Sequence, residues 1–436
     1  MMSEENQVPT RYKKTELGEI PEEWEIVKIN DCCDVKTGGT PSTKNKDYWD
    51  GNIPWMSSGE INKKFVYSTE KKITQQGLEN SNARILPADS VMVALNDQGK
   101  TRGSVAVLKI LSTCNQSLAC IVPDQKITHY LYLFYNLQSR YSEIRNYTGD
   151  TGREGLNLRI IKDINVPLPR LPEQHKIATI LSKVDEQIEQ TEQIIERTEI
   201  LKKGLMQKLL TKGIGHTKFK KTELGEMPEE WSVFRLSDLL ESKYILSHLD
   251  GNHGSNYPKP HEFVESGIPY VSANAIIGGV VDFSKAKYVA LERAKRFKKG
   301  IAENEDVLLA HNATVGPTAL LKTDLPYVIL STSLTYYRCD LQKISNFYLK
   351  YYMESPLFQN QLAKVMKQTT RNQVPITMQR NLYFCLPSIE EQRKIGNVLF
   401  CIEKQIMKNA NNLAKLQALK KGLMQDLLTG KVRVTV

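Results

Sequence analysis

The side chains best suited to chemistry in this sequence are polar and basic residues that gather in short, loop-like clusters between apolar runs. Such side chains can hydrogen-bond to base edges in the major groove of DNA, and lysines and hydroxyls can bind phosphates. A single cluster of this kind is most simply an ordinary surface loop. Clusters recur at corresponding places in both halves of the chain, however, and the set therefore predicts a surface that contacts double-stranded DNA. Its members are Lys44, Asn45, Lys46, Ser57, Ser58, Asn96, Gln98, Lys100, Thr101, Arg102, Arg153, Asn252, His253, Lys259, Ser272, Asn274, His311, Asn312, Thr314, Arg371, Asn372 and Gln373.

Two motifs of enzymes begin in this sequence but are not completed. Gln98-Gly99-Lys100-Thr101 resembles the end of a phosphate-binding loop, but Ala94 stands where that loop requires glycine. His261-Glu262 resembles the start of a zinc-protease motif, but Glu265 occupies the position of the second histidine. The sequence therefore predicts neither ATPase activity nor a catalytic zinc.

A nuclease site and a methyltransferase site are also not expected. Asp50 with Glu70-Lys71-Lys72 loosely fits a metal-nuclease carboxylate set, but Lys285 replaces Glu70 in the second half. The chain has neither a glycine-rich cofactor fingerprint nor the Asn-Pro-Pro-aromatic or Asp-Pro-Pro-aromatic tetrapeptide of adenine methyltransferases. We therefore expect no catalytic residue, no metal and no cofactor in this chain.

Composition narrows the class of protein further. The 436 residues carry a net charge of +10, which favours a polyanionic partner. The polar N-terminus and the lack of an apolar run near the roughly 20 residues of a membrane span predict neither a signal peptide nor an anchor. The cysteines are odd in number and scattered, which predicts reduced thiols and a cytoplasmic location; they are Cys32, Cys33, Cys114, Cys120, Cys339, Cys385 and Cys401.

The elements that would position the polar clusters belong to a tandem repeat. Lys13–Trp24 returns as Lys220–Trp231 with one difference, Ile20 against Met227. Two further blocks close each half with identical spacing between them: Glu173–Ile177 and Leu201–Gln207 in the first copy, Glu391–Ile395 and Leu419–Gln425 in the second. The intervening stretches diverge, which indicates one scaffold that carries two specificities.

Each half is predicted to end in a long amphipathic helix. Apolar residues follow a 3-4 seam at Ile177, Leu181, Val184, Ile188, Ile195, Leu205 and Leu209, and again at Ile395, Leu399, Ile402, Ile406, Leu413, Leu416, Leu423 and Leu427. About 38 residues give a helix of roughly 57 Å. Because neither helix can cover its seam alone, we expect an antiparallel coiled coil with pseudo-two-fold symmetry; two independent core helices are the alternative.

Two features of the helical stretches each allow two interpretations. Gly204 and Gly422 interrupt the pattern at a cost of about 1 kcal/mol relative to alanine. Either the helices pack closely or kink where they cross, or the backbone of a partner subunit approaches there. Residues 202–221 contain seven lysines and no acid, which is typical of a solvated linker or of a strip that follows a DNA backbone.

The resulting fold class is α+β, with a globular domain of mixed strands and helices before each long helix. The expected domains are 13–170 and 220–387, and the expected spacer helices are 171–213 and 388–430.

This layout resembles the specificity subunit of type I restriction-modification systems, the HsdS family. The resemblance rests on Gly18-Glu19-Ile20-Pro21-Glu22-Glu23-Trp24, Gly38-Gly39-Thr40-Pro41-Ser42 and the repeated helix blocks. It implies a non-catalytic subunit whose two target-recognition domains bind a bipartite, asymmetric DNA sequence. It also implies partners: two modification subunits that use S-adenosylmethionine, and restriction subunits that use ATP and Mg²⁺. We assign subunit contact to Gln174, Lys203, Gly204, Gln392, Lys421 and Gly422.

Two other functions are compatible with the residues alone. The chain could be a coiled-coil scaffold whose two globular domains bind proteins, or a stand-alone nuclease. Binding to several DNA phosphates weakens steeply as salt rises, whereas a protein scaffold need show no such slope.

Overall fold

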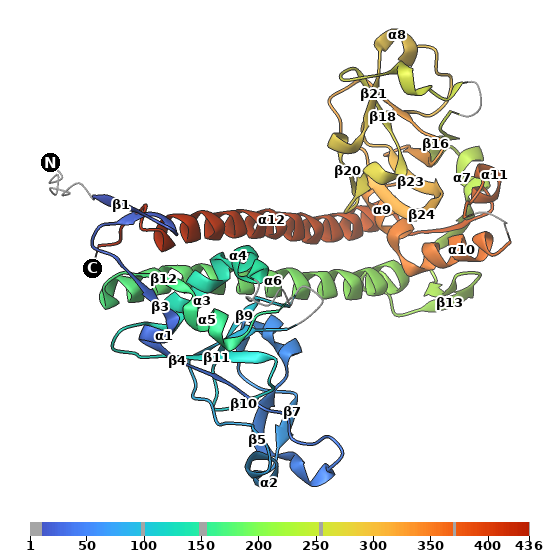
Figure 1. The fold of residues 1–436 in the computed structure, drawn as a ribbon. Helices are drawn as coiled ribbons and strands as arrows, with labels where there is room; N and C mark the ends of the chain where they lie inside the picture. Colours follow the sequence, from blue (N-terminus) through green and yellow to red (C-terminus); the bar gives the residue numbers. More distant parts are fainter. Residues whose placement is uncertain (1–10, 97–100, 148–154, 253–255, 369–371, 436) are drawn as a thin grey trace, which may run out of the picture. The chain divides into compact units, whose positions relative to one another are not determined.

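The computed structural model describes residues 11–96, 101–147, 155–252, 256–368 and 372–435, which form two compact units. Unit 1 joins Met1–Glu192 to Asn411–Val436, and unit 2 is Gln193–Ala410. Each unit contains one globular domain and a stretch of both long helices, α6 (Leu171–Lys212) and α12 (Ile389–Leu428), shown in Figure 1.

The domain of unit 1 is built on a five-stranded sheet in the order β4-β11-β8-β9-β6 and a three-stranded sheet in the order β10-β5-β7. The first sheet contains β4 (Cys33–Thr37), β6 (Phe65–Val66), β8 (Ser90–Ala94), β9 (Val105–Leu108) and β11 (Leu118–Pro123), and the second contains β5 (Trp49–Met56), β7 (Lys71–Ile73) and β10 (Thr113–Cys114). Two smaller pairs are the hairpin of β1 (Tyr12–Thr15) with β2 (Gly18–Pro21), and β3 (Glu25–Lys28) with β12 (Asn165–Leu168). The helices are α1 (Ile29–Cys32), α2 (Gln75–Glu79), α3 (Tyr130–Ser139), α4 (Tyr141–Asn146) and α5 (Leu158–Asp163).

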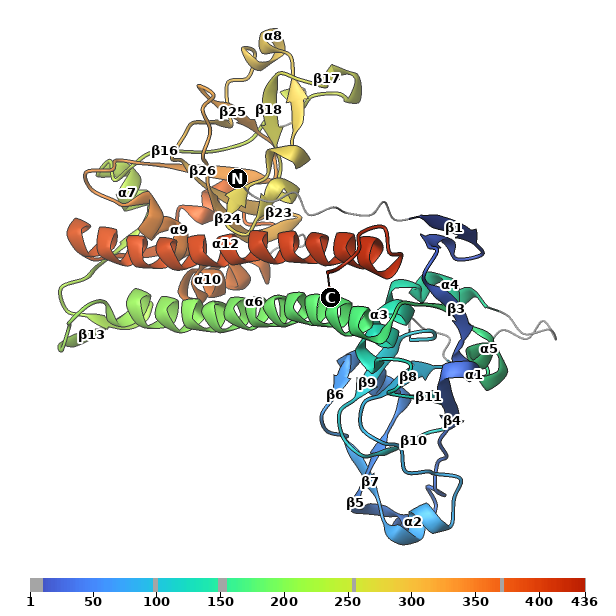
Figure 2. The same ribbon diagram turned by 90° about the vertical axis from the view of Figure 1, so that its left-hand side faces the viewer.

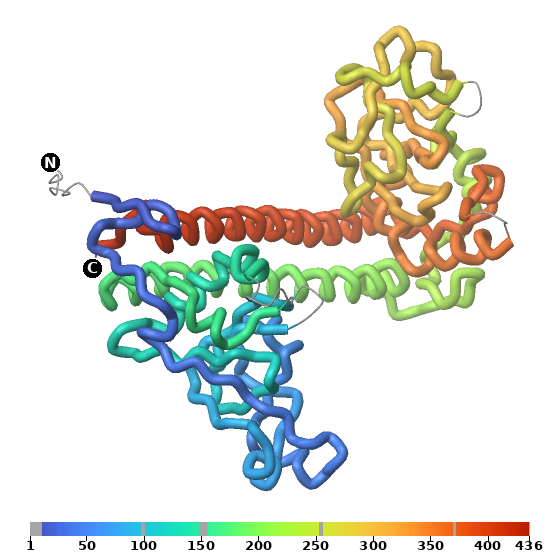
Figure 3. Tube along the Cα trace, in the orientation of Figure 1, coloured from blue at the N-terminus to red at the C-terminus, as the bar shows by residue number. Residues whose placement is uncertain are grey.

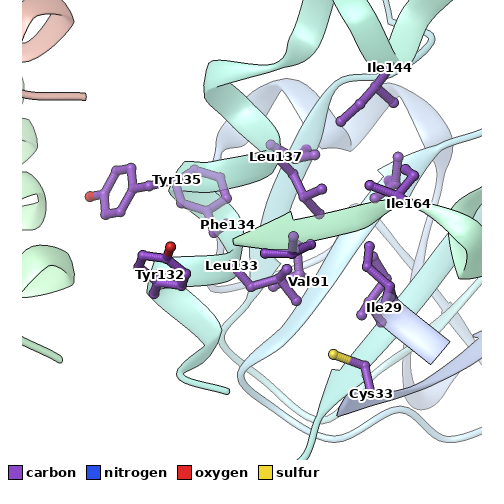
Figure 4. Packing of buried hydrophobic residues seen from close by; sticks show 14 of the residues in the cluster. Ile29, Cys33, Val91, Tyr132, Leu133, Phe134, Tyr135, Leu137, Ile144 and Ile164 are labelled. Carbon is purple, nitrogen blue, oxygen red and sulfur yellow. The ribbon is translucent and has the colours of Figure 1, made fainter. Parts of the chain in front are cut away.

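The core of this domain follows from its apolar runs. Strands β8 and β9 are buried along their whole length, because their residues are almost all apolar. The aromatic helix α3 packs against the same sheet and contributes Tyr132, Leu133 and Phe134. Figure 4 shows part of this cluster, with Leu133 beside Val91.

The domain of unit 2 has a four-stranded sheet in the order β16-β26-β23-β24 and a five-stranded sheet in the order β17-β21-β18-β25-β22. The first contains β16 (Ile245–Asp250), β23 (Val307–Asn312), β24 (Thr314–Leu320) and β26 (Leu334–Cys339), and the second contains β17 (Phe263–Val264), β18 (Ile268–Val271), β21 (Lys287–Val289), β22 (Ile301–Ala302) and β25 (Val328–Leu330). The smaller pairs are β13 (Phe219–Thr222) with β14 (Gly225–Pro228), β15 (Ser232–Arg235) with β27 (Tyr383–Leu386), and β19 (Ile276–Ile277) with β20 (Val280–Val281). The helices are α7 (Leu236–Glu241), α8 (Leu291–Ala294), α9 (Asn346–Glu354), α10 (Pro356–Met366) and α11 (Ile376–Gln379).

The two domains repeat one topology. In unit 1, β5 pairs antiparallel with β7 and parallel with β10. In unit 2, β18 pairs in the same two ways with β21 and β25. In each domain a short helix, α2 or α8, follows the antiparallel partner, so the predicted duplication extends to the three-dimensional structure.

Inside unit 1, the last part of α12 packs on the first part of α6. Leu427 and Leu428 share a core with Ile177 and Leu181, and Lys420 lies 2.8 Å from Asp185 further along α6. Residue numbers therefore rise along one helix as they fall along the other. The predicted antiparallel pairing is confirmed in this unit.

Unit 2 repeats the arrangement with the helix segments exchanged. Met206 and Leu210 of α6 share a core with Leu399 and Ile395 of α12, and the Lys202 ammonium lies 3.3 Å from a Glu403 carboxylate oxygen. The predicted antiparallel pairing is therefore present here as well, but on α6 the buried residues are Met206 and Leu210, each one position beyond the predicted seam residues Leu205 and Leu209, which are only partly buried.

Glycines end both long helices. Gly213 directly follows α6 and has a φ of +64°, and Gly430 lies shortly after the last residue of α12 and has a φ of +71°. Both are in the left-handed region, which glycine adopts without steric cost. Beyond Gly213 the chain soon enters β13, so residues 202–221 belong to a helix, a short connection and a strand. The interpretation of the whole stretch as a linker was wrong, because residues 202–212 continue α6, whose apolar side chains Met206 and Leu210 are buried, and only the short connection before β13 joins the helix to the domain.

Gly204 and Gly422 lie within the long helices and are exposed. A Cβ built on either glycine would have no neighbouring atom within 4 Å. Close packing inside the described chain therefore does not explain them.

Candidate nucleic-acid interface

Each domain is fastened to its long helix by a glutamate at the start of that helix. In unit 1 the buried Glu173 accepts a hydrogen bond of 3.2 Å from the indole of Trp24. Arg433 also donates to both oxygens of Glu173, at 2.7 and 2.9 Å. In this way one carboxylate joins the first repeated block, the first long helix and the end of the chain.

The corresponding glutamate in unit 2 is Glu391. It accepts a hydrogen bond of 3.1 Å from the indole of Trp231, and the imidazole of His216 lies 3.0 Å from it. These tryptophan–glutamate pairs were not among the predicted functional residues. The signal was present in the sequence, because each tryptophan ends one repeated block and each glutamate begins the next.

A buried glutamine next to each glutamate completes the attachment. Gln174 accepts from the backbone of His129 and donates to the carbonyl oxygens of Ile127 and Pro169. Gln392 repeats this pattern by accepting from Ser345 and donating to Pro387. Both side chains are at most 1% exposed, so their amides serve the attachment inside the unit and offer no surface to a partner subunit.

The other residues to which we assigned subunit contact lie on the helix surface. Lys203, Gly204, Lys421 and Gly422 are all exposed. Contact of these four residues with a partner stays a prediction.

In the first domain the predicted clusters after β8 and before α5 are held together at their bases. The backbone N–H of Leu156 donates to the carbonyl oxygen of Leu95 at 3.2 Å. Asn96 is exposed beside this contact, and its side-chain oxygen lies 3.2 Å from the position that a Cβ on Gly155 would occupy. The cluster of Ser57 and Ser58 follows β5, whose last residue, Met56, accepts from the backbone of Asn115.

The second domain joins its equivalent loops in the same manner. The N–H of Ala313 donates to the carbonyl of Asn372 at 2.9 Å, and Val374 donates to His311 at 2.8 Å. The cluster that begins at Ser272 is tied to this place by Ser333, whose hydroxyl accepts from Ala273 and whose carbonyl accepts from His311. In both domains, therefore, corresponding loops of divergent sequence are anchored at corresponding places in the fold.

Several predicted residues use their side chains to hold these loops. Ser57 caps the short helix Ser58–Lys63 together with Glu60, and Arg102 donates to the carbonyl of Arg145 at 3.0 Å. The side chains of Asn252 and His311 are buried, and Asn252 donates to the carbonyl of Lys299 at 2.7 Å. Because both side chains are buried, a base edge could not reach them in this conformation. They stabilise the loops of the predicted DNA-binding surface and do not form part of that surface.

The remaining predicted DNA-contacting residues are at least partly exposed where the structure describes them. Those in the described chain are Lys44, Asn45, Lys46, Ser58, Asn96, Thr101, Lys259, Ser272, Asn274, Asn312, Thr314, Asn372 and Gln373. Gln98, Lys100, Arg153, His253 and Arg371 lie outside the described residues. Base contact by individual residues stays a prediction.

The electrostatics of the interior come from buried ion pairs between the helices. Burial lowers the pKa of Lys420, although Asp185 favours its charged form. Burial alone would raise the pKa of Glu403, but Lys350 and Lys202 hold it below its ordinary value.

Among the described residues, no group of three or more His, Cys, Asp or Glu side chains could hold a metal ion.

The comparison with protein families identifies the repeated architecture. The model of the type I restriction-modification DNA specificity domain matches residues 21–199 and 228–417, once in each half of the chain. The chain belongs to the specificity subunits of type I restriction-modification systems. It is therefore a DNA specificity subunit and a non-catalytic component of its complex.

Relatives of this specificity subunit match over nearly its full length. The MjaVIII specificity subunit of Methanocaldococcus jannaschii is 29% identical and covers 95% of this chain and 94% of its own. The EcoBI specificity subunit of Escherichia coli is 23% identical over 90% of this chain and 80% of its own. The crystal structure of the S subunit from M. genitalium has the same fold, with a TM-score of 0.62, 16% identity and coverage of 93% of this chain and 96% of that chain.

Among the residues that the structure describes, no helix combines the length and the apolar character that a bilayer span requires.

Proposed function

We propose that the two target-recognition domains of this specificity subunit each bind one half of a bipartite, asymmetric DNA sequence. The observation that carries the proposal is the pair of corresponding loop sites, anchored alike by backbone hydrogen bonds but composed of different residues. Equal anchoring favours the same mode of docking for both domains, and different residues favour different base preferences.

We further propose that modification subunits dock on the long helices around Gly204 and Gly422. A helical glycine costs about 1 kcal/mol relative to alanine, and neither glycine is needed for packing inside the described chain. The exposed Leu201 and Leu419 lie one turn away from these glycines, with 53% and 50% of their surfaces accessible. An exposed apolar side chain beside a bare stretch of helix backbone is a surface on which another helix can pack closely. The two equivalent sites support two modification subunits.

The chemistry in this proposal belongs to the partners. The modification subunits would bind S-adenosylmethionine and methylate adenines, and restriction subunits would use ATP and Mg²⁺. The specificity subunit would select the DNA and bring the partners to it. Because its target is the chromosome, we infer a cytoplasmic location.

The experiment for DNA recognition is genome-wide mapping of methylated adenines with and without this gene. The expected result is a gene-dependent motif made of two different half-sites at a fixed separation. Exchange of residues 220–387 for the corresponding domain of a relative should change one half-site and leave the other unchanged. An active system without a gene-dependent bipartite motif would contradict the proposal.

The docking proposal is tested by Gly204→Met and Gly422→Met, which fill the open space without breaking a helix. Each variant should lose one modification subunit from the purified complex, and the double variant should lose both. Lys208→Met changes another exposed position of α6 and is the matched control. Complexes of unchanged stoichiometry for both glycine variants would refute docking at these positions.

A further inference from the structure

The end of the second domain carries an unusual concentration of positive charge. Residues 284–300, here called the distal basic segment, contain seven basic residues and one acid, Glu292. The basic residues are Lys285, Lys287, Arg293, Lys295, Arg296, Lys298 and Lys299, and all except Arg293 are exposed. The segment includes β21 and α8, and Figure 2 shows α8 at the end of the domain of unit 2 that lies away from α12.

An aromatic cluster fixes the backbone of this segment. Val289, Ala294 and Phe297 are at most 3% exposed and pack with Tyr270 and Ile329. Because these apolar side chains face inward, the lysines and arginines between them face solvent. The charges are therefore held on a fixed surface.

Most of these cations lack an acidic partner. Lys295 pairs with Glu292 at 2.7 Å, and Arg293 donates to Glu262 at 2.7 Å. In the described part of the chain no ion pair within 4 Å is formed by Lys285, Arg296, Lys298 or Lys299, although the pKa of the Asp282 carboxyl is lowered by hydrogen bonds from Ser284 and also by the nearby Lys285. Like charges crowded without counter-charges repel one another, and a polyanion relieves that repulsion.

The distal basic segment is joined to a loop already predicted to contact DNA. Asn252 donates to the carbonyl of Lys299 at 2.7 Å, and a guanidinium nitrogen of Arg293 donates to the carbonyl of Asn256 at 3.1 Å. Next to Lys299, Gly300 adopts φ +64° and a Cβ there would lie 2.7 Å from the Cα of Gly251. These contacts hold the segment against Gly251, Asn252 and Asn256.

The equivalent place in the first domain is close to neutral. Residues 69–85, which include β7 and α2, contain the basic residues Lys71, Lys72 and Arg84 and the acids Glu70 and Glu79. Helix α2 itself has no basic residue, whereas α8 contains Arg293 and is followed directly by Lys295 and Arg296. The two domains thus differ in charge at the same point of a shared topology.

We propose that Lys285, Arg296, Lys298 and Lys299 contact DNA phosphates beside the half-site of the second domain. That domain then carries the larger share of the salt-dependent binding. This inference rests on the DNA-binding function of the chain. Phosphate contacts position a protein on the duplex without selecting a base, so these residues set register and affinity and leave base choice to the loops.

The test uses the full chain assembled with its modification subunits. Lys298→Gln/Lys299→Gln is compared with wild type and with the matched variant Lys71→Gln/Lys72→Gln of the first domain. DNA affinity is measured from about 50 to 200 mM salt, where each lost phosphate contact reduces the slope of log affinity against log salt by about 0.9. The expected result is a slope smaller by about 2 for the first variant and a smaller change for the second. The methylated sequence should stay the same in both.

Two further measurements identify the cause of any loss. Lys298→Arg/Lys299→Arg keeps the charge and should retain the wild-type slope. An unchanged slope in the glutamine variant, an equal loss in the first-domain variant, or a changed methylation motif would overturn the proposal. If the wild-type complex bound DNA without sequence preference, the proposed bipartite recognition would be contradicted. The salt dependence of affinity in the variants would still show whether Lys298 and Lys299 contact phosphates.

Discussion

The ammonium nitrogen of Lys420 lies 2.8 and 2.9 Å from the two carboxylate oxygens of Asp185. The two side chains come from α12 and α6 and are 12% and 10% exposed. Tyr135 donates to the same carboxylate at 2.9 Å, so the ion pair also connects the domain of unit 1 to both helices. The equivalent pair in unit 2 is Lys202 with Glu403, which Lys350 and Tyr351 also contact.

Replacing Lys420 by methionine should destabilise unit 1 by about 3 to 5 kcal/mol, because Asp185 would stay buried without a counter-charge. The double variant Lys420→Met/Asp185→Leu should regain much of this loss. Urea unfolding measures both, and Lys415→Met at an exposed position of α12 is the control. A double variant as unstable as the single one would show that the buried charge is not the cause.

Acid should weaken unit 2 through His248. Burial lowers the pKa of this histidine to about 4, and its imidazole lies 3.0 Å from the side-chain oxygen of Gln379. The unfolded chain, with a histidine pKa near 6.5, binds more protons between these values, so stability falls as pH falls from about 6.5 toward 4. The loss should reach about 2 kcal/mol near pH 5.

The contribution of His248 is isolated by His248→Gln, which keeps a side-chain donor toward Gln379. Its free energy of unfolding should depend less on pH between about 7 and 5 than that of wild type. His261→Gln, at an exposed site, should keep the wild-type dependence. Equal pH dependence in both variants would rule out the histidine as the origin.

Removing the arginine near the end of the chain should loosen the start of α6. Arg433→Ala leaves Glu173, which is 4% exposed, with the indole of Trp24 as its side-chain partner among the described residues. Loss of the charge partner of a buried carboxylate costs about 3 to 5 kcal/mol. Hydrogen exchange of the first turns of α6 measures the effect, and Arg433→Lys should restore part of it. Unchanged exchange in the alanine variant would show that solvent compensates the carboxylate.

Alanine at the two open glycines should stabilise the isolated subunit. Gly204→Ala and Gly422→Ala each replace a flexible residue in an exposed helix, for a gain of about 1 kcal/mol. Thermal unfolding of the subunit without partners measures this gain. A loss of stability would indicate a contact that these glycines make in the chain itself.

The helices and the duplication were predictable from sequence because they depend on repeated local patterns. The seam residues Ile177, Leu181 and Ile395 are buried as their spacing requires, and glycine ends both helices. The attachment of each domain to its helix was harder to predict from sequence, since Gln174 resembles any exposed polar residue of a first helical turn. Its burial depends on backbone groups of Ile127 and His129, which no local pattern places beside it.

The loop surface was predictable as a region but not as individual side chains. The clusters after β8 and β23 do occupy corresponding places, because the strands before them are matched apolar runs. Asn252 and His311 could not be distinguished from surface residues, since their burial arises from contacts with residues distant in sequence. The distal basic segment was visible in composition, but only the matched topology of β7 and β21 revealed that its counterpart is nearly neutral.

Unit 1 is built from two segments that lie far apart in the sequence, and this determines when it can fold during synthesis. The core of unit 1 includes Leu427 and Leu428, and the hydroxyl of Tyr12 donates to the carbonyl of Gly430 at 3.2 Å. Figure 3 shows the first hairpin of the chain beside the end of α12. During synthesis the apolar face of α6 in unit 1 therefore stays uncovered until the segment that begins at Asn411 has been made, whereas the segments of unit 2, which end at Ala410, are complete earlier. Loop closure over such a separation is slow, and the nascent first half is the stage at which the chain is most exposed to aggregation.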